Sequence, residues 1–197
     1  MKNKNILYLL PILFYILTLS GCASSLKKST RYKPDNALIY SDMASTKKPI
    51  HVHLFSTSEA DLGIESSRDT ANAMVKSAPH LLAIDIVDKL RQSGFTQVTL
   101  DGSDGEPSDS ALNLTGKFTI LNPGNQGLRL MFGFGAGKSK VCVEGQLIDS
   151  SGEILTDFAQ CRSGLGWGSS APQLEKETEI LGYSIADLLI KWLQTGK

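Results

Sequence analysis

Hydrophobic and polar positions alternate along several segments of the chain, and this pattern predicts a β-sheet. Alternation with a period of two is typical of strands that bury one face. Four segments are expected to be strands: residues 50–55, 96–100, 112–120 and 154–162. A further strand is expected to run through a glycine-rich stretch as far as Ile148, and residues 37–40 can dock as a short additional strand.

Two other segments have apolar residues at the spacing of an amphipathic helix. In residues 71–93, Pro79 interrupts the helical pattern, and Ser77 is a suitable cap for the part that follows. Gly94 ends this helix, and its inward positions are Leu82, Ile86 and Leu90. A last helix is expected over residues 170–192, with one apolar stripe along it: Leu174, Leu181, Ile185, Leu188 and Trp192.

These elements predict a single α+β domain over residues 50–197. We expect a largely antiparallel sheet of about five strands, with two helices packed on one face, in the order β-α-β-β-β-α. The chain has 197 residues, of which 41% are hydrophobic, so it can bury a core of this size. Its formal net charge is zero. No basic patch indicates a nucleic-acid partner.

The N-terminus carries the pattern of an export signal. Lys2 and Lys4 precede an apolar run at residues 6–19, which is too short to span a bilayer comfortably. The sequence Leu19-Ser20-Gly21-Cys22 follows and resembles the bacterial lipobox. By that resemblance residues 1–21 are a lipoprotein signal peptide.

The lipobox resemblance implies that Cys22 is acylated and becomes the first residue of the mature protein. Two or more acyl chains hold a protein stably on a membrane. Residues 22–49 are polar and are expected to form a lipidated tether. Ala23, in place of an aspartate, favours the outer membrane of a Gram-negative bacterium. We therefore expect a lipid-anchored domain that faces the periplasm.

The densest glycine in the sequence lies at residues 133–137. The block continues into Lys138 and Ser139 as a phosphate loop would, but that motif also needs a glycine at position 132, which is Phe132. Apolar positions are even-numbered before the glycines and odd-numbered after them. A strand that changes phase must absorb one extra residue, and glycine permits this. We therefore expect a bulge or a corner here.

This stretch is expected to pair with a second glycine-and-aromatic stretch at residues 164–168. A turn that pairs Asp149 with Glu153 sets Gly135 opposite Trp167, and an intervening bulge would shift this pairing by one residue. The large apolar residues at this end of the sheet either complete the core or form a partner contact. The positions concerned are Phe132, Phe134, Gly135, Leu165 and Trp167.

Cys142 and Cys161 lie on the two strands that this turn connects. The periplasm is oxidising, which favours a disulfide. The pairing described above sets Cys142 opposite Gln160 and places the two cysteines on opposite faces. A bulge or a tighter turn would bring them together, so the sequence leaves both outcomes open.

Few residues suggest reaction chemistry. His51 and His53 are two residues apart, but a metal site needs further ligands, and both are expected to be solvated surface residues. The acidic loop at residues 101–109 lacks calcium ligands at Ser103 and Gly105, and no G-x-S-x-G motif is present. We therefore expect no metal, no cofactor and no enzymatic activity.

The glycine-lysine block at residues 133–141 resembles that of a family of bacterial envelope lipoproteins catalogued only as a domain of unknown function. Residues 112–116, 127–130 and 147–153 match the same family. The resemblance covers roughly residues 50–192, and the two cysteines Cys142 and Cys161 are not part of it. It implies a small α/β domain on a lipid anchor, with no assigned activity.

Together these observations predict a non-enzymatic lipoprotein of the envelope. It is expected to bind other envelope proteins or to associate with itself. The alternative is an accessory module that binds a small envelope ligand such as a lipid or a glycan. A hydrolase is a weaker alternative, since three histidines offer few candidate bases.

Overall fold

The computed structural model describes residues 36–39, 48–101, 109–125, 127–128, 131, 137–164 and 171–195, with the backbone alone for 36–39 and 195. The chain divides into two units, residues 1–31 and 32–197, and every described residue belongs to the second. Within the described ranges, none of the helices combines the length and the apolar character needed to cross a bilayer.

The described residues form one six-stranded sheet in the order β1-β6-β5-β4-β2-β3. The strands are β1 (Asn36–Ile39), β2 (Ile50–Val52), β3 (Val98–Leu100), β4 (Leu112–Asn122), β5 (Lys140–Ile148) and β6 (Ile154–Ser163). β4, β5, β6 and β1 pair antiparallel, whereas β2 runs parallel to both β3 and β4. The sheet is therefore mixed rather than purely antiparallel, because the connection from β2 to β3 is a helical crossover.

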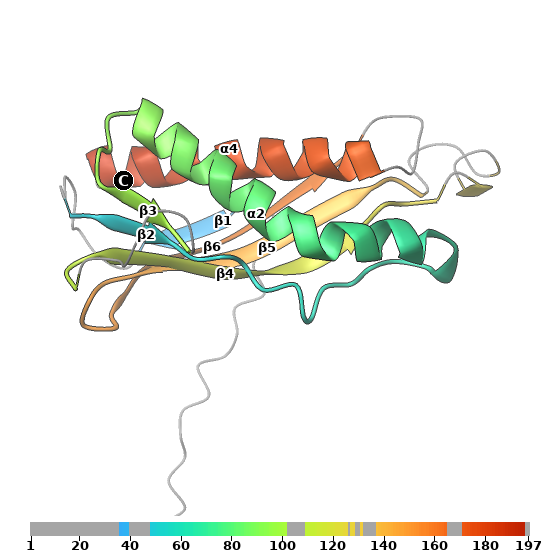
Figure 1. Cartoon of the computed structure of the whole chain (residues 1–197), viewed down its shortest axis with the longest axis horizontal. Helices are drawn as coiled ribbons and strands as arrows, with labels where there is room; N and C mark the ends of the chain where they lie inside the picture. The colour runs from blue at the N-terminus through green and yellow to red at the C-terminus, as the bar shows by residue number, and fades with distance from the viewer. Residues whose placement is uncertain are drawn as a thin grey trace, which may run out of the picture. The chain divides into compact units, whose positions relative to one another are not determined.

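Two long helices, α2 (Arg68–Gln92) and α4 (Ala171–Thr195), cover one face of the sheet (Figure 1). A short 3₁₀ helix, η1 (Glu65–Ser67), precedes α2. The expected α+β domain with two helices is confirmed, but its described elements follow the order β-β-α-β-β-β-β-α. This order has two strands more than the predicted one: β1 at the start, which pairs with β6, and a fourth strand between the two helices.

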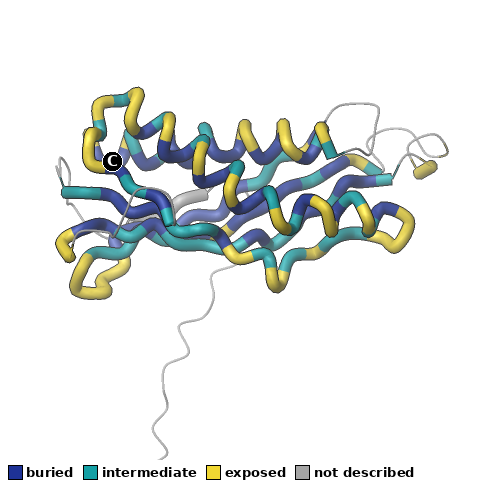
Figure 2. The backbone as a smooth tube through the Cα atoms, viewed as in Figure 1, coloured by how far each residue is buried: buried dark blue, intermediate teal, exposed yellow. Residues whose placement is uncertain are grey.

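The core lies between the sheet and the two helices, where the buried backbone of Figure 2 is concentrated. The expected inward positions of both helices are confirmed, with Leu188 the only one of them that is partly exposed. At Gly182 the helices come close, since a Cβ there would lie 2.8 Å from the Cβ of Asp85. The largest fully buried side chains include Trp192, Phe55, Phe118 and Phe158.

Pro79 does not interrupt α2, which continues through it, so the prediction of a break with Ser77 as a cap is wrong. Proline has no N–H to donate to the carbonyl four residues earlier, which is that of Val75. In this structure the Thr57 hydroxyl donates to the Val75 carbonyl at 3.4 Å. Pro79 itself is buried. A side chain from the segment after β2 therefore satisfies the backbone group that proline leaves free.

The hairpin between β5 and β6 begins with the expected pairing and then changes register. Asp149 N–H donates to the Glu153 carbonyl, and Ile148 pairs with Ile154 as predicted. A shift between Leu147 and Ile148 then leaves Leu155 as an extra residue on β6. This bulge brings Cys142 opposite Cys161, and a disulfide joins them.

Two glycines lie opposite each other in the middle of the sheet, and an aromatic ring covers each. Gly116 on β4 pairs with Gly145 on β5. A Cβ added to Gly116 would overlap the Phe55 ring, and one added to Gly145 would overlap the Phe158 ring. Aromatic cover of strand glycines is a known stabilising device. The sequence prediction assigned this arrangement to Gly135 and Trp167, which lie outside the described residues.

The strand predicted through the glycine stretch is wrong for residues 137–139, because β5 begins only at Lys140, whereas residues 132–136 lie outside the described residues. Leu128 instead has helical backbone geometry. Asn125 N–H donates to the Gly137 carbonyl at 2.8 Å and closes the loop. Gly124 and Gly137 have φ values of 80° and 67°, and a Cβ on either would overlap the backbone of the other loop segment. These two glycines therefore permit a close approach of backbones.

Candidate functional site

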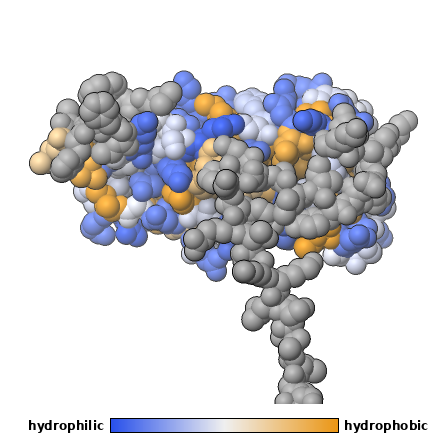
Figure 3. Space-filling model, turned by 180° about the vertical axis from the view of Figure 1, so that it is seen from behind, coloured by the Kyte–Doolittle hydropathy of each residue, from blue (hydrophilic) through white to orange (hydrophobic). Residues whose placement is uncertain are grey.

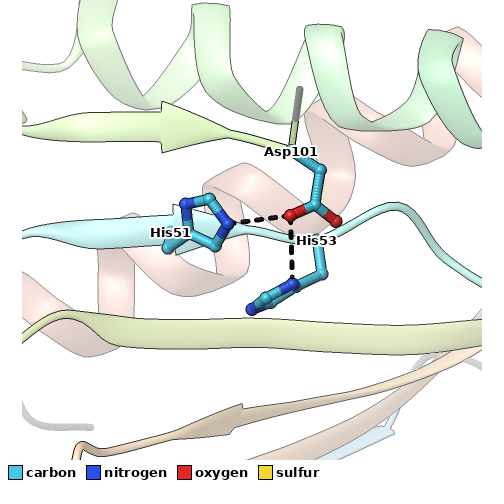
Figure 4. A group of neighbouring side chains, drawn as sticks. All are labelled: His51, His53 and Asp101. Carbon is cyan, nitrogen blue, oxygen red and sulfur yellow. Dashed lines mark hydrogen bonds and ion pairs between the residues drawn. The ribbon is translucent and has the colours of Figure 1, made fainter. Parts of the chain in front are cut away.

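A cluster of two histidines and one aspartate lies at the carboxyl ends of two parallel strands (Figure 4). β2 contains His51 and is followed by His53, and β3 is followed directly by Asp101. Because His51 pairs with Thr99 in parallel register, the residues that follow both strands meet at the same edge. The Asp101 N–H also donates to the Val52 carbonyl at 3.2 Å, which fixes this residue beside the end of β2.

The three side chains converge on one carboxylate oxygen. Asp101 Oδ1 lies 2.9 Å from His51 Nε2 and 3.2 Å from His53 Nδ1. The two imidazole rings stand edge to face, with centroids 4.5 Å apart. One potential ligand atom from each residue lies within 4.8 Å of the other two. The cluster therefore presents two nitrogens and one oxygen to a single point.

Each side chain of the cluster is held in place through its second polar atom. His51 Nδ1 lies 2.7 Å from Thr99 Oγ1, and His53 Nε2 lies 3.1 Å from Asn113 Oδ1. The Leu54 N–H donates to Asp101 Oδ2 at 3.0 Å. These bonds orient the rings and the carboxylate from β3, from β4 and from the backbone after β2.

The burial of His51 contradicts the expectation of two solvated surface histidines. Its side chain is 3% exposed, whereas those of His53 and Asp101 are 34% and 36% exposed. Period-two alternation places the side chains of His51 and Val52 on different faces of the sheet, and the His51 face is expected to be solvated. However, β2 lies between β3 and β4, and all three residues of β2 are buried. A polar residue in such a strand must find partners. The cluster therefore has one buried side and one side that solvent reaches.

The Asp101 carboxylate is held in its ionised form. Partial burial acts to raise the pKa of Asp101, but the hydrogen bonds from Leu54 N–H and His51 and the proximity of His53 outweigh it, and the pKa lies below its ordinary value. An ionised carboxylate and two imidazoles can act as a hydrogen-bonded network or as three ligands of a divalent metal ion.

Thr99, His51 and Asp101 also place a hydroxyl, an imidazole and a carboxylate in series, as in a nucleophilic relay. Catalysis would require a substrate position beside the Thr99 hydroxyl. Neither of the two grooves described below is lined by Thr99 or His51. These grooves therefore offer no substrate position for such a relay.

A groove of about 410 Å³ lies at the glycine end of the sheet. Its lining includes Gly124, Gly137, Lys138 and Lys140. Its apolar lining includes Ile64 and Leu128, which are 47% and 39% exposed. The remaining lining residues are Asn122, Asn125, Ser139 and Ser163.

A second groove, of about 470 Å³, is lined by mostly polar residues of β4, β5 and β6, among them Thr115, Lys117, Glu144 and Asp157. On the side of the molecule shown in Figure 3, visible hydrophobic residues occur in small separate areas among hydrophilic ones. Both grooves are open to solvent rather than enclosed.

The sequence predictions for the site have different outcomes. The Cys142–Cys161 disulfide is present in the structure. It joins β5 and β6, whereas the histidine cluster lies at β2 and β3, on the other side of β4 in the strand order. The lipidation position Cys22 lies outside the described residues, as do the five positions of the predicted partner contact: Phe132, Phe134, Gly135, Leu165 and Trp167. Asp101 was considered only as a calcium-loop position. Asp101 could have been recognised as a site residue from its position directly after β3, once β3 is known to run parallel to β2.

Three of the solved structures that are similar to this chain are the following. A PelC dodecamer from Paraburkholderia phytofirmans is 15% identical, with a TM-score of 0.50 over 81% of this chain and 97% of that one. A variant PelC dodecamer is 17% identical, with a TM-score of 0.48 over 81% and 99% of the two chains. Protein XCC0632 of Xanthomonas campestris, from the DUF330 family, is 13% identical, with a TM-score of 0.38 over 57% and 60%. At such identity, the likeness at a TM-score of 0.50 concerns the fold alone.

No curated protein sequence matches the chain. A family described as "Domain of unknown function (DUF4410)" matches residues 35–168. This match begins just before β1, includes all six strands and α2, and ends before α4. It covers more than half of the 197 residues. The chain therefore belongs to the DUF4410 family.

Proposed function

We propose that the protein is a non-enzymatic lipoprotein of the Gram-negative outer membrane that assembles with copies of itself at the periplasmic side. The proposed anchor is Cys22, in the lipobox-like sequence at residues 19–22. The Cys142–Cys161 disulfide supports an oxidising compartment, because disulfides are rare in reducing cytosol. Both observations agree with an exported protein.

The anchor would keep the sheet close to the membrane. β1 begins at Asn36, which is 36 − 22 = 14 residues after Cys22. Even a fully extended chain of this length reaches at most about 50 Å. Copies anchored in this way would share a thin layer beside the membrane, where their local concentration is high and weak contacts suffice for assembly.

The observation that carries the assembly proposal is the groove at the glycine end of the sheet. Ile64 and Leu128 expose apolar surface at its lining, and Met131, three residues after Leu128, is 77% exposed. Exposed apolar side chains that gather around a groove are typical of contact surfaces. The PelC neighbour of similar fold is described as a dodecamer, and we extend self-association to this chain as part of the proposal.

The ligand-binding alternative is less well supported. Small-molecule sites are usually concave, apolar pockets that enclose most of the ligand. The two grooves are open to solvent, so neither would enclose most of a small ligand. The exposed apolar residues are therefore better explained by a protein contact than by a small ligand.

A matched pair of variants tests the assembly. Ile64 lines the groove and is 47% exposed, whereas Ile84 on α2 is 46% exposed and does not line it. We expect the protein part of the detergent-solubilised particle to have a light-scattering mass greater than that of one chain, which is at most 21.3 kDa for the full sequence. Ile64→Glu should reduce this mass, and Ile84→Glu should not. A monomeric wild type, or an equal effect of both substitutions, would contradict the proposal.

A further inference from the structure

We propose that His51, His53 and Asp101 form a binding site for a divalent transition metal ion, with Zn²⁺ as its most suitable occupant. The ligand atoms are His51 Nε2, His53 Nδ1 and Asp101 Oδ1. Imidazole nitrogens with one carboxylate oxygen suit zinc and its neighbours in the first transition row rather than Mg²⁺ or Ca²⁺, which prefer oxygen ligands.

The spacing between the Asp101 oxygen and each histidine nitrogen is close to that of a zinc site. Bonds of about 2.0–2.1 Å in a tetrahedron place ligand atoms about 3.4 Å apart. Asp101 Oδ1 lies 2.9 Å from His51 Nε2 and 3.2 Å from His53 Nδ1, and all three atoms lie within 4.8 Å of one another. The two distances from the Asp101 oxygen therefore differ from the spacing of a tetrahedral zinc site by a few tenths of an ångström.

The hydrogen bonds of His53 carry the proposal furthest. The Asn113 amide donates through Nδ2 to the Ala111 carbonyl at 3.3 Å, which turns its oxygen Oδ1 toward His53 Nε2. When His53 donates through Nε2 to Asn113, its Nδ1 is the atom that faces Asp101 Oδ1, 3.2 Å away. The bond to Asn113 would therefore hold the His53 ring in the orientation that a metal ion beside Asp101 requires.

His51 can offer its Nε2 to the same ion. Its Nδ1 faces the Thr99 hydroxyl, which can accept the proton of Nδ1, so Nε2 can exchange its contact with Asp101 Oδ1 for a bond to the metal. A zinc-binding histidine usually donates its other N–H to an oxygen that fixes the ring. Thr99 Oγ1 and Asn113 Oδ1 occupy these positions for the two histidines.

The exposure of the site agrees with three protein ligands and one further position. His51 is buried, while His53 and Asp101 are each about one-third exposed on the solvent side. Zinc is commonly four-coordinate, and a site with three protein ligands takes a water molecule as the fourth. The bound ion would join the ends of β2 and β3, because His51 and His53 lie in or just after β2 and Asp101 lies just after β3.

Zinc titration of the untagged full chain in detergent tests the site, after metal is removed with a chelator. Isothermal titration calorimetry should show one Zn²⁺ per chain, and bound zinc should raise the melting temperature. His53→Ala and the isosteric Asp101→Asn should each weaken binding by at least about tenfold. His80→Ala, which removes an exposed histidine of α2, should bind as the wild type does.

Two results would overturn the proposal. One is the absence of stoichiometric zinc binding to the wild type. The other is binding that His80→Ala abolishes, or that both His53→Ala and Asp101→Asn leave unchanged. Because Asp101→Asn preserves the shape of the side chain, it keeps the test valid if His53→Ala fails to fold, and circular dichroism distinguishes these cases.

Discussion

Cys142 and Cys161 lie directly opposite each other on β5 and β6, with Cα atoms 4.1 Å apart, and a disulfide joins them. The bulge at Leu155 produces this relationship, because without it Cys142 would face Gln160. The bond links the two strands near the glycine end of the sheet and closes a loop with a sequence separation of 19 residues.

Removal of this disulfide should destabilise the domain. A cross-link that closes a loop of this length restricts the unfolded chain and contributes about 3 kcal/mol. The double variant Cys142→Ala, Cys161→Ala should lose about this free energy of unfolding, measured by urea denaturation. Reduced wild type should match the variant. Identical unfolding midpoints for the oxidised wild type and the variant would contradict this prediction.

The hydroxyl of Thr57 should matter because Pro79 frees the Val75 carbonyl. Thr57→Val keeps the size of the side chain but removes the hydrogen bond, which should cost about 1 kcal/mol of unfolding free energy. Thr57→Ser retains the hydroxyl and serves as the matched control. Urea denaturation of both variants measures the difference. Equal stability of the Val and Ser variants would show that the bond to Val75 contributes nothing.

Asp85 on α2 should make the stability depend on pH. Burial, chiefly, and then the nearby Glu179 and Asp88 raise the pKa of Asp85 from 3.8 to about 6. The folded state therefore binds this proton more tightly than the unfolded state, and its contribution to stability is lost as the pH rises from about 4 to 6.

Asp85→Asn removes this dependence. The variant should be more stable than the wild type at pH 7.5, by about 1 kcal/mol once solvent screening of this partly exposed group is allowed for. The advantage should disappear at pH 4, where the wild-type carboxyl is protonated. Denaturation of both proteins at the two pH values checks this. An equal advantage at pH 4 would show that the ionisation of Asp85 is not the cause.

The sequence predicted the elements whose hydrophobic period is long and regular. The stripe of α4 and the inward positions of α2 agree with the structure, because side-chain periodicity follows directly from helix geometry. Leu112, Leu114 and Phe118 of β4 also agree, because alternation follows from strand geometry, but a register shift after Phe118 buries Leu121 in place of Ile120. The path of α2 through Pro79 was missed, since it depends on Thr57, a residue distant in sequence that satisfies the Val75 carbonyl.

Properties that depend on long-range pairing could not be read from the sequence. The parallel position of β2 between β3 and β4 brings His51 and Asp101 together and buries His51. A single-residue bulge at Leu155 decides whether Cys142 meets Cys161. Local pattern does not encode strand order, and one inserted residue reverses the facing of every side chain beyond it.

The measurement that most directly tests the central claim, a lipid-anchored envelope protein, is the membrane fractionation of Cys22→Ala. The Cys22 thiol is the proposed acyl acceptor, so the wild type should sediment with outer membranes and carry acyl chains detectable by mass spectrometry. The variant should remain an unprocessed, unacylated precursor that retains residues 1–21. An acylated, normally processed and membrane-bound Cys22→Ala protein would contradict the claim.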